Sequence, residues 1–107
     1  MASFEEREKG FENKYKHDQD KLFKITARRN KLLGLWAAEQ LGLKGADAEA
    51  YAKDVVVADF QKPGVDDVVQ KVVGDFQKRG VNIEAHKVRH ELQKFAVEAE
   101  AQINAAG

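Results

Sequence analysis

Two histidines at helical spacing are the residues of this sequence best placed to do chemistry. His86 and His90 lie four positions apart, so on a helix they share one face, as zinc ligands often do. The residue after His86 is Lys87, where a zinc protease carries its glutamate, and no third ligand is evident. We therefore expect a surface pair and no metal site.

A short basic cluster is the second candidate for a site. Arg28, Arg29 and Lys31 lie close to Trp36 and could hold a phosphate-bearing ligand. A solvated helix face explains the same residues more simply, because the cluster is short and the chain is neutral overall. Neither glycine-rich phosphate motif, G-x-x-x-x-G-K-[ST] or G-x-G-x-x-G, is present.

Nothing in the sequence indicates catalysis. Ser3 is the only serine, and the absence of cysteine excludes disulfides and thiolate metal sites. No nucleophile stands with a base and an orienting group in a recognisable pattern. We expect a protein that is not an enzyme and that requires no cofactor.

The composition indicates one small domain that neither binds nucleic acid nor spans a membrane. The chain has 107 residues, and its 18 basic residues equal its 18 acidic ones, which argues against nucleic-acid binding. The longest apolar run, 32–38, is interrupted by Gly34 and is too short to span a membrane. We expect a cytoplasmic protein that does not insert into the membrane.

Glycine and proline divide the chain into four helical segments. Breaks fall at residues 42–45, 63–64 and 80, and the segments between them show apolar residues at helical spacing. The expected core positions are Leu22, Ile25, Leu32, Leu33 and Trp36; Ala48, Tyr51, Ala52, Val55, Val56 and Phe60; Val65, Val68, Val69, Val72, Val73 and Phe76; and Val88, Leu92, Phe95, Ala96, Ala99 and Ile103. The short links favour antiparallel neighbours, so the predicted fold is all-α, a four-helix bundle over residues 19–107.

Three local features refine this prediction. Gly42 is expected to cap the first helix, and the fourth begins at either Asn82 or Glu84, with Ile83 and Val88 able to form a hydrophobic staple. Arg29 falls on the apolar stripe. Either its aliphatic side-chain carbons cover the core while its guanidinium stays in water, or it is a contact residue whose charge is paired. The segment DFQKPGV at 59–65 recurs as DFQKRGV at 75–81, which we interpret as two similar helix ends, each with a core aromatic, a lysine and a glycine.

Residues 1–18 form a charged arm that nevertheless carries aromatic anchors. Phe4, Phe11 and Tyr15 are spaced by seven and four, and Tyr15 precedes Leu22 by seven, so one helical phase continues into the first bundle helix. Gly10 and the small apolar content make the free arm a poor helix. The arm either packs back onto the bundle or, as we favour, is mobile and becomes helical in a partner's groove.

Several motifs together resemble a known family. The stretch ARRNKLLGLWAAE at 27–39, with Gly10-Phe11-Glu12, His17-Asp18 and Ala50-Tyr51-Ala52-Lys53, is similar to the ATP synthase ζ subunit, the ATPase inhibitor of alphaproteobacteria. The resemblance covers nearly the whole chain. It implies a four-helix bundle whose mobile arm inserts into the catalytic head of the F-type ATP synthase, becomes helical and blocks ATP hydrolysis sterically.

The resemblance also implies roles for particular residues. Phe4, Phe11 and Tyr15 would anchor the arm around Gly10, while the arm's cations would pair with carboxylates between catalytic and rotor subunits: Arg7, Lys9, Lys14 and Lys16. Weak adenine-nucleotide binding by the bundle would use Arg28, Arg29 and Lys31. The free protein would be a monomer in the bacterial cytoplasm, peripheral to the inner membrane through the ATP synthase. Two alternatives are a helical adaptor for another protein and a weak nucleotide sensor with little inhibitory activity.

Overall fold

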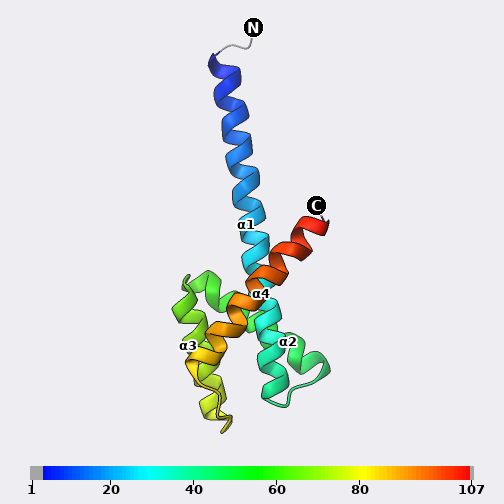
Figure 1. Cartoon of the computed structure of the whole chain (residues 1–107), viewed down its shortest axis with the longest axis vertical. Helices are drawn as coiled ribbons and strands as arrows, with labels where there is room; N and C mark the ends of the chain where they lie inside the picture. The colour runs from blue at the N-terminus through cyan, green and yellow to red at the C-terminus, as the bar shows by residue number, and fades with distance from the viewer. Residues whose placement is uncertain (1–3, 107) are drawn as a thin grey trace.

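The structure, a computed structural model, describes the backbone of residues 4–106 and the side chains of residues 19–106. It consists of four α-helices: α1 (Phe4–Gln40), α2 (Gly45–Gln61), α3 (Val65–Lys78) and α4 (Ala85–Ala106). The described part of the chain contains no strand, so the all-α prediction is confirmed. The helix α1 is continuous, and its first half projects beyond the three shorter helices (Figure 1).

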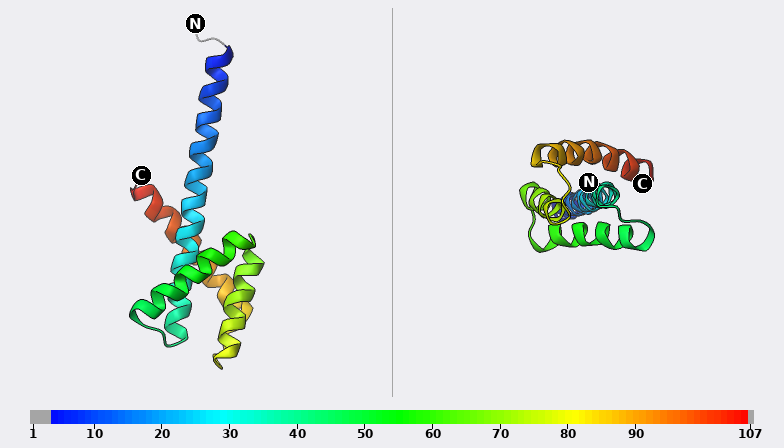
Figure 2. Two further views of the ribbon diagram at one scale, coloured as in Figure 1. Left: turned by 180° about the vertical axis from the view of Figure 1, so that it is seen from behind. Right: turned by 90° about the horizontal axis from the view of Figure 1, so that it is seen from below.

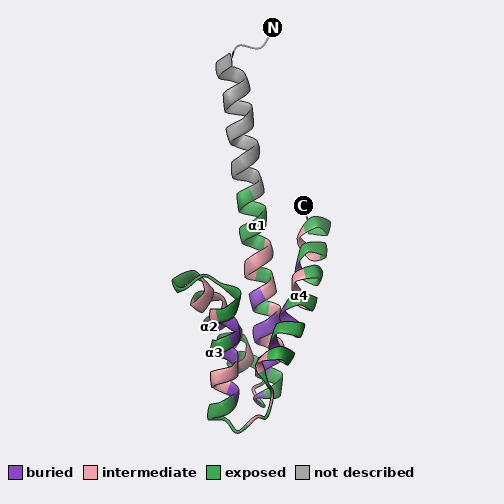
Figure 3. Ribbon diagram, turned by 60° about the vertical axis from the view of Figure 1, so that its left-hand side comes forward, coloured by how far each residue is buried: buried purple, intermediate pink, exposed green. Residues whose placement is uncertain are grey.

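The second half of α1 is the central element against which the other helices pack. Seen along α1, the helices α2 and α4 lie on opposite sides of it, and α3 contacts both of them (Figure 2). The buried residues gather where the four helices meet, while the stretch of α1 just before this region is exposed (Figure 3). The core consists of Leu33, Ala37, Leu41, Val55, Val68, Val69, Val72, Phe76, Val88 and Leu92.

Most of the predicted core positions are correct, and three are wrong. Leu22, Phe60 and Val65 remain 63%, 52% and 42% exposed. Leu22 lies on α1 before the level at which the other helices cover it, whereas Phe60 and Val65 occupy the last turn of α2 and the first residue of α3. Helical spacing identifies the apolar face of a helix but not how much of its length a neighbour covers.

The two similar helix ends differ in structure. After α3, Gly80 adopts a positive φ of 72°, and the amide of Val81 donates to the carbonyl of Phe76 at 2.8 Å. Phe76 is fully buried, as predicted, but its counterpart Phe60 is not. At the end of α2, Pro63 stands where the second segment has Arg79. The glycine that follows, Gly64, occupies the N-cap position of α3 instead of closing α2.

The cap at Gly42 follows the sequence prediction, and the structure decides the start of α4. Gly42 has a φ of 79°, and the amide of Leu43 donates to the carbonyl of Ala38 at 2.9 Å, which closes α1. The sequence left the start of α4 open between caps at Asn82 and Glu84; the helix begins at Ala85, and the carbonyl of the preceding Glu84 accepts from the amides of Lys87 and Val88. Ile83 packs against the core cluster that contains Val88, as a hydrophobic staple does.

Gly34 lies at a close approach of α1 and α2. A Cβ atom at this position would lie 2.6 Å from the Cα of Ala52, a backbone atom that can move only with its helix. Gly34 is therefore not a break in an apolar run. It is the position at which the two helices cross in contact.

We expect Gly34→Ala to destabilise the protein by about 1–3 kcal/mol, because the added methyl group forces the helices apart. The matched control is Gly74→Ala in α3, where a Cβ would meet nothing within 4 Å. The control should stabilise the protein by up to about 1 kcal/mol, since alanine has the higher helix propensity. Urea unfolding of both variants measures this, and equal changes would show that the crossing tolerates a side chain.

Candidate functional site

Arg29 is a paired residue in a polar network between α1 and α2. Its guanidinium lies 3.8 Å from Asp59, and its Nε donates to the Asn30 side chain at 3.1 Å. Asn30 in turn donates to Asp59 at 2.8 Å, and the other oxygen of Asp59 accepts from the amide of Gly64. The second interpretation of Arg29, as a contact residue, is thus confirmed.

Burial makes this network sensitive to the loss of any member. Asn30 is 1% exposed, and the side chains of Arg29 and Asp59 are 15% and 13% exposed. Burial lowers the pKa of Arg29, and the charge of Asp59 opposes this shift. An arginine remains protonated despite such a shift, so the network holds one cation and one carboxylate.

We expect Asp59→Ala to destabilise the protein by about 2–4 kcal/mol, because it leaves a half-buried guanidinium and a buried amide without their acceptor. Asp54→Ala, an exposed carboxylate of the same helix, should change stability by less than about 0.5 kcal/mol. Chemical denaturation of the two variants tests this. Equal effects would mean that the network contributes no more than a surface charge does.

The predicted phosphate-binding cluster is divided by the fold. Arg29 is committed to Asp59, whereas Arg28 and Lys31 are exposed. Lys31 borders a shallow depression against α2 that also contains Glu49 and Lys53. A role of Arg28, Arg29 and Lys31 in nucleotide binding stays a prediction.

A hollow of about 400 Å³ opens between α1 and α2 beside the network. Asn30 and Asp59 of the network are among its lining residues, and most of the lining is apolar. The rings of Phe23 and Phe60 face each other across the two helices with centroids 4.9 Å apart. Lining residues are Gln19, Leu22, Phe23, Thr26, Ala27, Asn30, Val56, Asp59, Phe60 and Pro63.

A second polar cluster joins α2 to α3. The Tyr51 hydroxyl donates to Asp75 at 2.8 Å, and the same carboxylate oxygen accepts from Lys71 at 3.1 Å. The ammonium of Lys71 also lies 5.5 Å from the centre of the Tyr51 ring. Burial, followed by the hydrogen bond and the charge of Asp75, raises the pKa of Tyr51.

This shift predicts a difference in stability at alkaline pH. The environment of Tyr51 in the folded protein favours the protonated hydroxyl. Its contribution to stability is complete below about pH 10, the pKa of tyrosine in the unfolded chain, and is lost progressively as the pH rises above that value. Between about pH 10 and pH 11, the free energy of unfolding of the wild-type protein should therefore fall more steeply than that of Tyr51→Phe. At pH 7 the substitution itself should lower the free energy of unfolding by about 1 kcal/mol, because the hydrogen bond to Asp75 is lost. Parallel pH profiles of unfolding would contradict the buried hydrogen bond.

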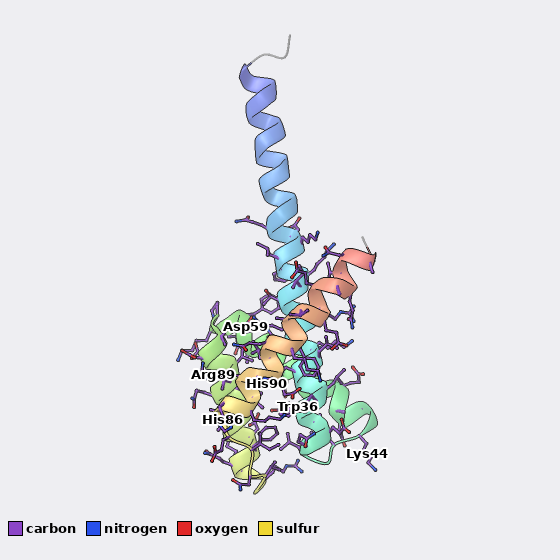
Figure 4. The ribbon with its side chains drawn as sticks, in the orientation of Figure 1. Trp36, Lys44, Asp59, His86, Arg89 and His90 are labelled. Carbon is purple, nitrogen blue, oxygen red and sulfur yellow. The ribbon has the colours of Figure 1, made fainter. Side chains whose placement is uncertain are left out.

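The histidine pair lies on the surface of α4 (Figure 4). Both side chains are exposed, and the His86 Nδ1 lies 3.3 Å from a carboxylate oxygen of Glu84. Among residues 19–106, the structure brings together no group of three histidine or acidic side chains that could hold a metal ion.

Sequence reasoning missed three residues of the α1–α2 contact: Phe23, Asn30 and Asp59. Asn30 lies within the basic cluster that was considered for phosphate binding, and Asp59 lies within the segment that was interpreted as a helix end. Phe23 lies next to the predicted stripe rather than on it. Only Gly34, a glycine inside a helical pattern, carried a signal that could have been used.

Residues 4–18 of the arm form the first part of α1. The backbone of residues 4–18 is helical, and the side chains of the predicted anchors and cations lie outside those that the structure describes. No helix of the described chain is both long and apolar enough to cross a membrane.

Comparison with known proteins identifies the family. The family model described as ATPase inhibitor subunit zeta matches residues 1–102, which include the arm, the first three helices and most of α4. The chain belongs to the ATPase inhibitor subunit zeta family. The resemblance inferred from the motifs is thereby confirmed.

A solved structure supports the fold of this family member. A protein whose structure was determined by solution NMR is 44% identical, and the match covers 79% of this chain and 96% of that one, with a TM-score of 0.69. The comparison with curated proteins found no match.

Proposed function

We propose that this protein is an inhibitory subunit of the F-type ATP synthase that acts by inserting residues 1–18 as a helix into the catalytic head. The observation that carries the proposal is the family match over residues 1–102. The inhibition is steric in this mechanism: the arm occupies a crevice between catalytic and rotor subunits and stops rotation in the direction of ATP hydrolysis. The chain performs no reaction itself and requires no cofactor.

The continuity of α1 supports a rod-like mechanism. An α-helix of 37 residues is about 55 Å long. Its second half is held between α2 and α4, with the tight crossing at Gly34. A force on the arm would therefore be transmitted along one helix to a packed bundle, which is too bulky to follow the arm into a crevice.

The composition of the arm suits insertion between protein subunits. Phe4, Phe11 and Tyr15 would occupy apolar pockets, and Gly10 would keep the free arm from forming a stable helix. The cations would pair with carboxylates of the crevice: Arg7, Lys9, Lys14 and Lys16. The free protein would be a monomer and would work at the cytoplasmic face of the bacterial inner membrane, where this head lies.

Nucleotide binding by the bundle is a weaker part of the proposal. Arg28 and Lys31 are exposed and available to a phosphate, whereas Arg29 already has an acceptor in Asp59. Any adenine nucleotide bound there would be held by few groups, so the affinity would be low and its role regulatory.

We expect Phe11→Ala to weaken inhibition about tenfold, because a central aromatic anchor of an interface is lost. The measurement is ATP hydrolysis by the purified catalytic head, titrated with full-length wild-type and variant protein. Val97→Ala, on an exposed position of α4, is the matched control and should inhibit as wild type does.

Helix content and thermal unfolding distinguish the possible causes of a loss. Both should stay unchanged in Phe11→Ala if the arm packs only against the partner. Unfolding of the variant would mean that Phe11 belongs to the core of the bundle. If even the wild-type protein fails to inhibit or bind the head, the adaptor or sensor alternative replaces the proposal.

A further inference from the structure

Basic residues form a row along one face of the continuous helix α1. Its positions follow one another at alternating intervals of three and four, which keeps them on one face with a drift of only about 20° per seven residues. We call them the basic row, and none of them carries a carboxylate: Arg7, Gly10, Lys14, His17, Lys21, Lys24, Arg28 and Lys31. The row is about 36 Å long, at 1.5 Å per residue.

The acidic residues of the same stretch all lie off this row. Residues 5–20 contain six carboxylates, and each occupies another position of the helix: Glu5, Glu6, Glu8, Glu12, Asp18 and Asp20. Solubility does not require such sorting, because interspersed charges of both signs serve it equally well. A face of one sign on a chain of zero net charge is therefore typical of a contact with an oppositely charged surface.

The part of the row that belongs to the bundle is exposed and unpaired. The structure describes the side chains of its last four members, and all four are exposed: Lys21, Lys24, Arg28 and Lys31. None of them forms an ion pair with another described side chain, whereas Lys71, Lys87 and Lys94 lie 3.1, 3.1 and 3.8 Å from a carboxylate oxygen. Glu49 and Lys53 of α2 border the depression next to Lys31, and their charges offset each other.

The basic row faces away from the hollow between α1 and α2. Consecutive residues of an α-helix are about 100° apart, so Asn30, which lines the hollow, lies about 160° around α1 from Arg28. The same angle separates Phe23, another lining residue, from Lys21. A partner on the basic row therefore needs no contact with the hollow.

We propose that the basic row continues the partner surface of the arm onto the bundle, where Lys21, Lys24, Arg28 and Lys31 bind an acidic surface of the catalytic head. The inference rests on the proposed function. The occupant is the head subunit that borders the crevice on this side of α1. It presents carboxylates along about 15 Å, the length of α1 from Lys21 to Lys31.

Continuity of the row along one helix is the reason for choosing this occupant. Arg7 and Lys14, for which carboxylate partners in the crevice are proposed, belong to the same row as the exposed cations of the bundle. Lys21 lies about two turns beyond Lys14 on the uninterrupted helix α1. An acidic wall that follows the arm along this face reaches Lys21 and Lys24 without a change of direction.

Two other polyanions fit the row less well. Nucleic-acid binding normally requires an excess of basic residues, and this chain has none. A helix that lies on a membrane needs a broad apolar face beside its cations. At Arg28 and Lys31 the apolar face of α1 is covered by α2 and α4, so no such face remains there to enter a bilayer.

The test compares two double variants of the row with a control of equal net charge, all as full-length protein. The row variants are Lys21→Gln with Lys24→Gln, and Arg28→Gln with Lys31→Gln. The control is Lys44→Gln with Lys78→Gln, which removes two exposed cations of α2 and α3 that form no ion pair with a described side chain. Glutamine keeps a helix propensity close to that of lysine and arginine.

The measurement is the rate of association with the immobilised catalytic head, without added nucleotide. At about 50 mM salt we expect each row variant to associate about threefold to tenfold more slowly than wild type, because charges at the edge of an interface act mainly on the association rate. The control should stay within about twofold. At about 500 mM salt the differences should disappear, since exposed charges are screened. Circular dichroism checks that each variant is folded.

The outcomes separate this inference from the proposed function. If Phe11→Ala weakens binding while either row variant associates as the control does, the acidic contact along the row is overturned and the inhibitory arm stands. If wild-type protein does not bind the head, both are overturned. If the row variants lose binding to vesicles of phosphatidylglycerol but associate normally with the head, the row is a lipid-binding surface and the inference is wrong.

Discussion

The close crossing of α1 and α2 at Gly34 is the contact on which the rest of the structure depends. Because the Cα of Ala52 occupies the space that a side chain at Gly34 would need, the two backbones can come this close only with a glycine at position 34. The same faces then meet through Asn30 and Asp59, and farther along through Phe23 and Phe60. One contact between small residues thus leads to a polar network and then to an open hollow.

The other two helices are attached by contacts of different chemistry. The core valines and Phe76 bury one face of α3, and the Tyr51–Asp75 hydrogen bond fixes it to α2. An ion pair of 2.6 Å between Asp66 and Arg89 links α3 to α4 at the surface. The apolar contacts supply most of the stability, whereas the polar ones, which are directional, determine how the helices are oriented.

This arrangement suits the steric mechanism proposed above. The packed half of α1 is held on two sides, while its first half extends beyond the other helices. A long helix anchored at one end can act as a stop in a rotary enzyme without any catalytic group.

The sequence by itself determined the number and type of the helices and most of their ends, because these depend on local features. Apolar spacing, the caps at Gly42 and Gly80, and Pro63 act within a few residues of the chain, and the motifs around residues 27–39 were sufficient to indicate the family. Only the tertiary structure decided which apolar residues are covered and which polar residues meet. Phe60 and Phe76 stand in nearly identical segments, yet one is exposed and the other buried, because a neighbouring helix covers only the second. Asn30 and Asp59 are 29 positions apart, and no local pattern relates them; the helix crossing at Gly34 brings them together.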